Sequence, residues 1–147
     1  MPQAVEIESA LRIRIAVMRL SRLLRPTEAG LAADLSPTRV AVLLNVVRNA
    51  PVRLAQVAED EGLNPTLLSR TVAWLAETGL LSRTADPEDR RSAWLEPTEA
   101  GLALARRIRE ERTEAMENAL ADLSPAARAT IEAALPALEA LAERLGR

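Results

Sequence analysis

The side chains in this 147-residue sequence that could act on a ligand or substrate are arginines and carboxylates. All 19 basic residues are Arg, because the chain contains neither Lys nor His, and Cys, Tyr and Phe are absent as well. Without His there is no ordinary base that titrates near neutral pH, without Cys no thiolate, and without Lys no Schiff base. We therefore predict that the protein is not an enzyme and has no catalytic residues.

The same residue types limit the metals that the chain could bind. Zinc, copper and iron sites need thiolate or imidazole ligands, whereas carboxylates suit magnesium or calcium. The densest carboxylate group is Asp86, Glu88 and Asp89, and it is followed at once by Arg90 and Arg91. We expect Asp89 to orient one of these arginines by an ion pair, so no metal site and no cofactor are predicted.

Charge and composition indicate the class of protein. The net charge is −2, but the acidic excess lies in residues 95–147, which contain ten acidic residues and seven arginines. A 48% hydrophobic chain of this length fits one domain or two interleaved small ones. It contains neither an export signal nor an apolar run of membrane length, so we expect a cytoplasmic protein without a membrane partner.

Capping residues predict where several helices begin and end. Ser36-Pro37, Asn64-Pro65 and Ser124-Pro125 each combine an N-cap side chain with a proline that has no N–H to leave unpaired. Gly62 and Gly79 suit the left-handed conformation just past a helix end. A kink is expected at Pro136, which falls inside the last predicted helix.

Apolar periodicity predicts the remaining elements. Helices are expected over about 5–25, 37–49, 54–61, 64–78, 98–120 and 124–145, a hairpin over 80–84 and 92–96, and a connection over 26–35. The fold class is therefore mainly α with a small β-hairpin. Glu59, Asp60 and Glu61 are interpreted as a solvated helix end.

Two of these helices, joined by Gly62-Leu63, have the form of a helix-turn-helix, whose second helix enters the DNA major groove. The outward face of that second helix is small and polar, which permits close approach to base edges, and Arg70 can reach a guanine or a phosphate. The hairpin would add a wing whose arginines, Arg90 and Arg91, could enter a minor groove or hold phosphate. The small outward residues are Pro65, Thr66, Ser69 and Ala73.

At these residues the sequence resembles the MarR family of winged-helix transcription regulators. The family's wing signature has Asp-x-Arg, five residues, Leu-Thr, two residues and Gly, which appears here from Asp89 to Gly101 with Pro97 in place of Leu. The stretch 64–70, followed by Leu75 and Gly79-Leu80, also resembles the family's recognition helix and the strand after it. The resemblance covers nearly the whole chain.

The resemblance implies a homodimeric repressor that binds double-stranded DNA at a pseudo-palindromic operator. Residues 1–34 and 98–147 would form the helical dimerisation region and residues 35–97 the winged helix-turn-helix. The long helices carry more apolar surface than a small lobe could cover, which independently favours a dimer. The expected DNA contacts are Asn64, Pro65, Thr66, Ser69, Arg70 and Ala73 on the recognition helix, and Asp89, Arg90 and Arg91 on the wing.

The family also implies a small aromatic or anionic effector bound between the dimerisation helices and the winged-helix lobe. The expected pocket is lined by the helices over 5–25, 37–49 and 98–120. Its possible carboxylate partners are Arg12, Arg14, Arg19 and Arg22, for which the alternative is solvation or pairing across a dimer.

Alternatives remain at the level of residues and of function. Trp74 is interpreted as a flank residue packed beside Leu67 and Thr71, with base or sugar contact as the alternative, and Arg70 could pair with Glu77 instead of DNA. The competing function is a helical homodimer that binds a protein partner and uses its winged helix only as a scaffold.

Overall fold

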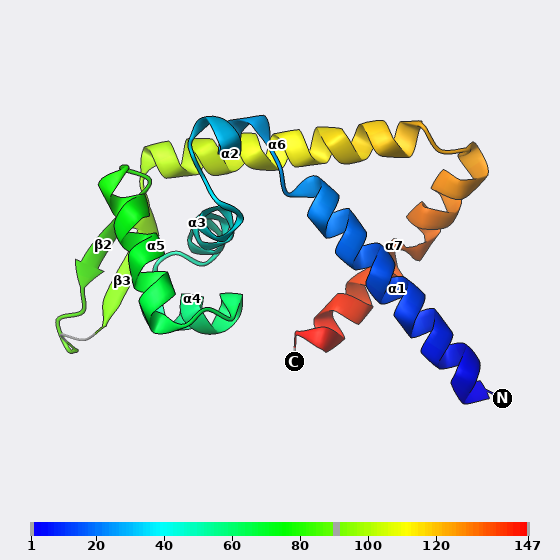
Figure 1. The fold of residues 1–147 in the computed structure, drawn as a ribbon, viewed down its shortest axis with the longest axis horizontal. Helices are drawn as coiled ribbons and strands as arrows, with labels where there is room; N and C mark the ends of the chain where they lie inside the picture. Colours follow the sequence, from blue (N-terminus) through cyan, green and yellow to red (C-terminus); the bar gives the residue numbers. More distant parts are fainter. Residues whose placement is uncertain (1, 90–91, 147) are drawn as a thin grey trace. The chain divides into compact units, whose positions relative to one another are not determined.

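The computed structural model describes residues 2–89 and 92–146, and the chain divides into two units, residues 1–112 and 113–147. The first unit carries a small sheet with helices beside it, and the second consists of helix alone (Figure 1). The elements are α1 (Pro2–Leu24), α2 (Glu28–Ala32), α3 (Pro37–Asn49), β1 (Val52–Arg53), α4 (Leu54–Glu61), α5 (Pro65–Glu77), β2 (Leu81–Ala85), β3 (Ala93–Pro97), α6 (Glu99–Ala121) and α7 (Pro125–Leu145). Helix α6 runs through the boundary between the two units.

The predicted helix caps are confirmed. The side chains of Ser36, Asn64 and Ser124 accept hydrogen bonds from backbone N–H groups three residues further on, and a proline follows each cap. Gly62 ends α4 in the left-handed conformation at φ 61°, and Gly79 follows α5 at φ 76°. Asn64 and Gly79 mark the two ends of α5, and Gly62 marks the end of α4, which is why these predicted bounds agree closely with the structure.

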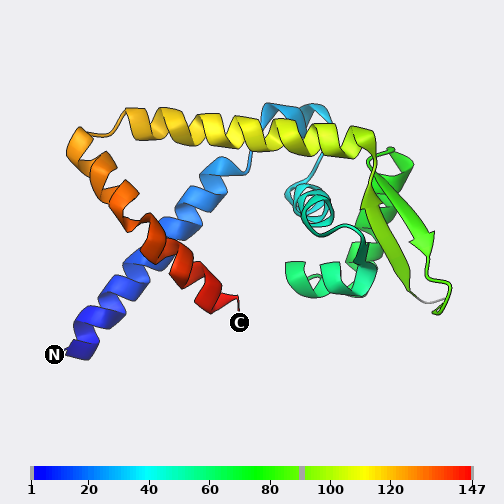
Figure 2. The same cartoon turned by 180° about the vertical axis from the view of Figure 1, so that it is seen from behind.

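The sheet has three antiparallel strands in the order β1-β3-β2. The hairpin was predicted one residue too early, since β2 and β3 begin at Leu81 and Ala93. The two-residue strand β1 was not predicted, and its Val52 lies opposite Leu95 in the ladder. Figure 2 shows α6 beginning directly beyond the end of β3, so the sheet leads straight into the long helix.

One core holds the first unit together. Its fully buried side chains come from α3, α4, α5, β3 and α6, and they are Val42, Leu43, Val46, Val57, Val72, Leu75, Leu95 and Ile108. The connection predicted over 26–35 contains a short helix, α2, that was not predicted. Thr27 caps α2 by accepting from Gly30 N, and the carboxylate of Glu111 accepts from Ala29 N at 3.0 and 3.2 Å.

The second unit has no buried residue in α7. This helix is continuous through Pro136 and presents a row of exposed apolar side chains. The row consists of Ile131, Leu135, Leu138, Leu141 and Leu145, of which Leu145 is 81% exposed. Within residues 2–89 and 92–146, none of the helices has the length and apolar character that crossing a bilayer requires.

Candidate nucleic-acid interface

Helix α5 is fixed by one apolar face. Leu68, Val72 and Leu75 are at most 1% exposed, and the helix packs against α3, α4 and β2. At its start, Asn64 Oδ1 accepts from Leu67 N at 2.8 Å. Thr71 is also buried, and its hydroxyl donates to the Leu67 carbonyl at 2.9 Å. These contacts leave the opposite face of a rigid helix open.

The outward face of α5 carries the side chains that the sequence placed there. Pro65, Thr66, Arg70 and Ala73 are exposed, and Ser69 is half-buried. Among the described residues, Arg70 forms no ion pair with Glu77, the acidic side chain that could have occupied its guanidinium. A narrow polar surface with one arginine is therefore available to a ligand.

The acidic end of α4 is exposed at Glu59 and Asp60, as predicted, but its carboxylates also form hydrogen bonds that the sequence did not indicate. Asn45 on α3 is 1% exposed, and its Nδ2 donates to Asp60 Oδ2 at 3.3 Å and to Glu61 Oε1 at 2.8 Å. Gln56 Nε2 donates to the other Asp60 oxygen at 2.8 Å. Asp60 and Glu61 thus join α4 to α3 and hold the first helix of the helix-turn-helix, with Glu61 half-buried.

Trp74 lies on the flank of α5 rather than on its outward face. It is half-buried against the core, and the Arg39 guanidinium carbon lies 3.7 Å from its ring centroid. Arg39 Nη1 also donates to the carbonyl of Asp34 at 3.0 Å. The packing interpretation of Trp74 agrees with this placement, although its neighbour is an arginine from α3, which the sequence did not indicate.

The base of the wing holds a buried carboxylate. Asp86 is 4% exposed, its Oδ1 accepts from Glu88 N at 3.0 Å, and its Oδ2 lies 3.3 Å from Arg53 Nη2. Asp89 is exposed. Arg90 and Arg91 lie outside the described residues, and so does the predicted ion pair between one of them and Asp89.

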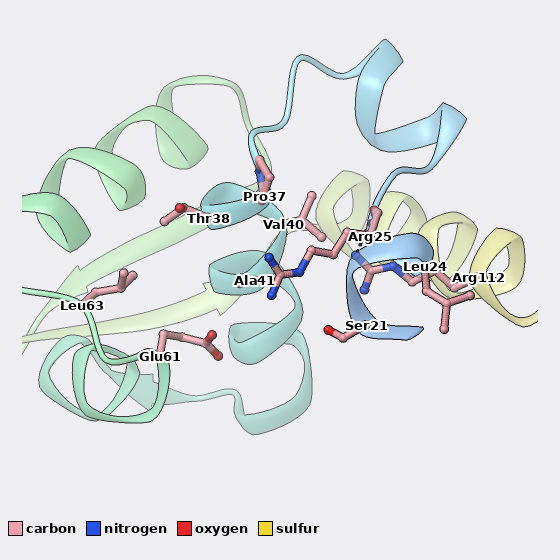
Figure 3. A pocket seen from close by; sticks show the side chains of 10 residues that line it. All are labelled: Ser21, Leu24, Arg25, Pro37, Thr38, Val40, Ala41, Glu61, Leu63 and Arg112. Carbon is pink, nitrogen blue, oxygen red and sulfur yellow. Dashed lines mark hydrogen bonds between the residues drawn. The ribbon is translucent and has the colours of Figure 1, made fainter. Parts of the chain in front are cut away.

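A cavity of about 460 Å³ opens in the first unit between α1, α3, the end of α4 and α6. Figure 3 shows the side chains of Arg25 and Arg112 extending into the space between α1 and α3, with Glu61 on the α4 side. Arg112 Nη2 donates to the Arg25 carbonyl at 3.3 Å, whereas the buried Arg112 Nε has no hydrogen-bond partner among the described residues. Burial and the neighbouring Arg25 guanidinium lower the pKa of Arg112.

The arginines that the sequence singled out for this pocket lie elsewhere. Arg12, Arg14, Arg19 and Arg22 are exposed on α1 and line only shallow hollows along that helix. The cavity is lined by the predicted helices, but its cations are Arg25 and Arg112. Both were missed because the spacing of arginines on a long helix does not reveal which of them faces a cavity. The one local signal at Arg25 is its position just before Pro26.

In the part of the chain that the structure describes, no group of three or more Asp or Glu side chains is placed to bind a metal ion. The candidate functional surfaces are the outward face of α5, the wing and the arginine-lined cavity.

A helix-turn-helix followed by an antiparallel hairpin and a long helix defines a winged-helix DNA-binding protein. Residues 35–93 match the model of the MarR family. The chain is also 28% identical over 131 residues to an HTH-type transcriptional regulator of Mycobacterium bovis, covering 89% of this chain and 90% of that protein. The matching family and the similar proteins are transcriptional regulators rather than enzymes.

Solved structures share the fold over nearly the full length. RV1404 from Mycobacterium tuberculosis superposes with a TM-score of 0.79 at 21% identity, covering 96% of this chain and 95% of that one. FabT from Streptococcus pneumoniae, solved in complex with DNA, superposes with a TM-score of 0.63 at 18% identity, covering 97% of each chain. The prediction of a mainly helical winged-helix fold is confirmed.

Proposed function

We propose that this protein is a sequence-specific repressor that binds a pseudo-palindromic operator as a homodimer. The observation that carries the proposal is the outward face of α5, where small side chains surround the exposed Arg70 on a helix fixed by its buried face. Such a helix can approach base edges closely, and a guanidinium can bind a guanine edge in two places. Arg70, Ser69 and Thr66 would read bases, while Asn64, Pro65 and Ala73 would shape the contact.

The wing would provide the second contact. Asp89, Arg90 and Arg91 follow the buried Asp86 that fixes the start of the turn. Arginines at such a tip can enter a narrow minor groove or hold phosphate, independently of base sequence. The structure of FabT in complex with DNA supports DNA as the ligand. A chromosomal DNA target would be met in the cytoplasm, where we propose that this protein acts.

Exposed apolar helices support the homodimer. On α1 the apolar side chains at described positions are almost all at least 42% exposed, and α7 has no buried residue. Large apolar faces on a single chain indicate association, and a twofold dimer would present two recognition helices to two half-sites. We assign dimerisation to residues 1–34 and 98–147 and DNA binding to residues 35–97.

The arginine-lined cavity would receive an anionic effector that releases the operator. Arg25 and Arg112 bring two positive charges to a space that holds only one carboxylate, Glu61. A carboxylate ligand would give the buried Arg112 Nε the acceptor that it lacks. Thermal-shift measurements with benzoate and hydroxybenzoates test this proposal, and Arg112→Gln should abolish any stabilisation. Aromatic acids that change neither melting nor DNA binding would contradict it.

Selection of binding sites from random duplex DNA tests the function directly. Enrichment of a palindrome is expected, and no enrichment at low salt would contradict the proposal. If each protomer neutralises three to four phosphates, the slope of log K against log salt should be about −6. Arg70→Ala should change sequence preference, whereas Arg91→Ala should weaken all duplexes alike and reduce the slope.

A protein-binding module is the second candidate function. Its support was the acidic net charge and the tryptophan on the recognition helix. In the structure Trp74 packs against the core and is covered by Arg39, so it offers little surface to a partner. The same random-site selection separates the two candidates.

A further inference from the structure

A second hollow of about 460 Å³ lies at the junction between α4, α5 and the wing. Arg53 is the last residue of β1 and directly precedes α4. Its lining includes Arg53, Pro65 at the start of α5, and Asp89 and Ser92 of the wing. The hollow therefore borders both elements to which we assign DNA binding, the start of the recognition helix and the wing.

The Arg53 side chain is held in place and still accessible. Its guanidinium carbon lies 4.9 Å from the ring centroid of Trp94, which is also its neighbour across the β1–β3 ladder. Its Nη2 lies 3.3 Å from Asp86 Oδ2. The Asp86 side chain is 4% exposed, whereas that of Arg53 is 50% exposed, so the guanidinium is the part of this ion pair that meets solvent.

In the proposed complex, a DNA backbone would cross this hollow. The major and minor grooves of a duplex are separated by a sugar–phosphate strand. When α5 occupies the major groove and the wing the adjacent minor groove, that strand must pass over the surface between Pro65 and the wing residues Asp89 and Ser92. Arg53 is the arginine that lines this surface among the described residues.

We infer that Arg53 binds an operator phosphate between the recognition helix and the wing, with Asp86 and Trp94 as its positioning residues. The inference rests on the proposed DNA-binding function. A guanidinium has five N–H donors, so the contact with Asp86 leaves donors for a phosphate. Because the stack and the ion pair already restrict the side chain, binding loses less conformational entropy than it would for a free arginine.

Arg53→Gln removes the positive charge while keeping a polar, although shorter, side chain. We expect affinity to fall at least about tenfold, equally for operator and random duplex, because phosphate contacts carry no base information. Each dimer would lose two phosphate contacts, so the slope of log K against log salt should change by about 2, from about −6 to about −4. Arg53→Lys should keep the slope while losing part of the affinity.

Arg106→Gln is the matched control, since it removes one exposed arginine from α6 and lies outside the hollow. Its salt slope should remain that of the unmodified protein, and melting curves of all variants establish that they are folded. If Arg53→Gln weakens binding with an unchanged slope, or if Arg106→Gln changes the slope equally, the inference is overturned. If the unmodified protein binds no duplex at low salt, the proposed function itself fails.

Discussion

Gly101 lies where α6 passes close to the backbone of Leu80, and this approach leaves no space for a side chain. A Cβ at this position would collide with the backbone carbonyl oxygen of Leu80 and lie 3.5 Å from Leu43 Cδ1. That carbonyl also accepts from Thr98 N at 3.1 Å, so it cannot move freely. Gly101→Ala should therefore destabilise the protein by about 1–3 kcal/mol, although alanine normally favours a helix.

Thermal unfolding of Gly101→Ala measures this effect, with an expected decrease in melting temperature of about 2–4 °C for each kcal/mol. Gly146→Ala is the control, because a Cβ there would meet its nearest atom at 3.7 Å. Equal melting temperatures for Gly101→Ala and the unmodified protein would show that the α6–β2 approach is not fixed by this glycine.

Asn45 is the polar residue that joins α3 to the helix-turn-helix. Asn45→Ala removes the donor to Asp60 and Glu61 and the acceptor for Asn49 Nδ2, so we expect a loss of about 1–3 kcal/mol in the free energy of unfolding. Chemical denaturation at fixed protein concentration measures it. Asn118→Ala, at an exposed position on α6, should change stability by less than about 0.5 kcal/mol. Similar losses for both variants would contradict the assignment.

The candidate site could be predicted from the sequence only where local chemistry decided it. The outward residues of α5 follow from helical periodicity once Asn64-Pro65 fixes the start of the helix. The roles of Arg25, Arg53 and Arg112 depend on contacts between distant segments, such as the Arg112 hydrogen bond to Arg25, 87 residues away. Because every basic residue in this sequence is an arginine, no local signal distinguishes these three arginines from the other arginines.

Among the elements, α3 and α5 are joined by the Arg39–Trp74 stack in addition to their apolar contacts. We expect Trp74→Leu to lose the cation–π interaction while retaining an apolar side chain, and Arg39→Gln to lose it from the other side. A double-mutant cycle of unfolding free energies should give a coupling of about 0.5–2 kcal/mol. A coupling of zero would mean that the two side chains lie close together without stabilising each other.

The elements missed by sequence analysis are short and depend on partners far along the chain. Helix α2 has five residues, and its N-terminus is completed by Glu111, 82 residues away. Strand β1 has two residues, too few for any periodicity, and exists because Val52 and Arg53 pair with β3. The longer helices were predicted because each contains an apolar repeat, and α3, α5 and α7 also begin at a capping residue.

For the whole molecule, the distribution of charge matters more than the net value of −2. The acidic excess lies in residues 95–147, mainly in α6 and α7, whereas residues 39–94 contain seven arginines and seven acidic residues. Of those acidic residues, Asp60 and Glu61 are hydrogen-bonded to Asn45, and Asp86 is paired with Arg53. Non-specific DNA binding should consequently be modest and should depend on a few well-placed arginines.

The proposed dimer leads to a prediction for the complete protein. Leu138 is 43% exposed in the apolar row of α7, and Ala140 lies on the opposite face of the same helix. Leu138→Asp would place a charge in the interface, so sedimentation should show a monomer. Operator affinity should fall by orders of magnitude, because a monomer contacts only one half-site. The melting temperature should no longer rise with protein concentration, as it must for a dimer that unfolds to separate chains.

Ala140→Asp adds the same charge outside the row and should remain a dimer with full operator binding. A dimeric Leu138→Asp variant would contradict the assignment of α7 to the interface.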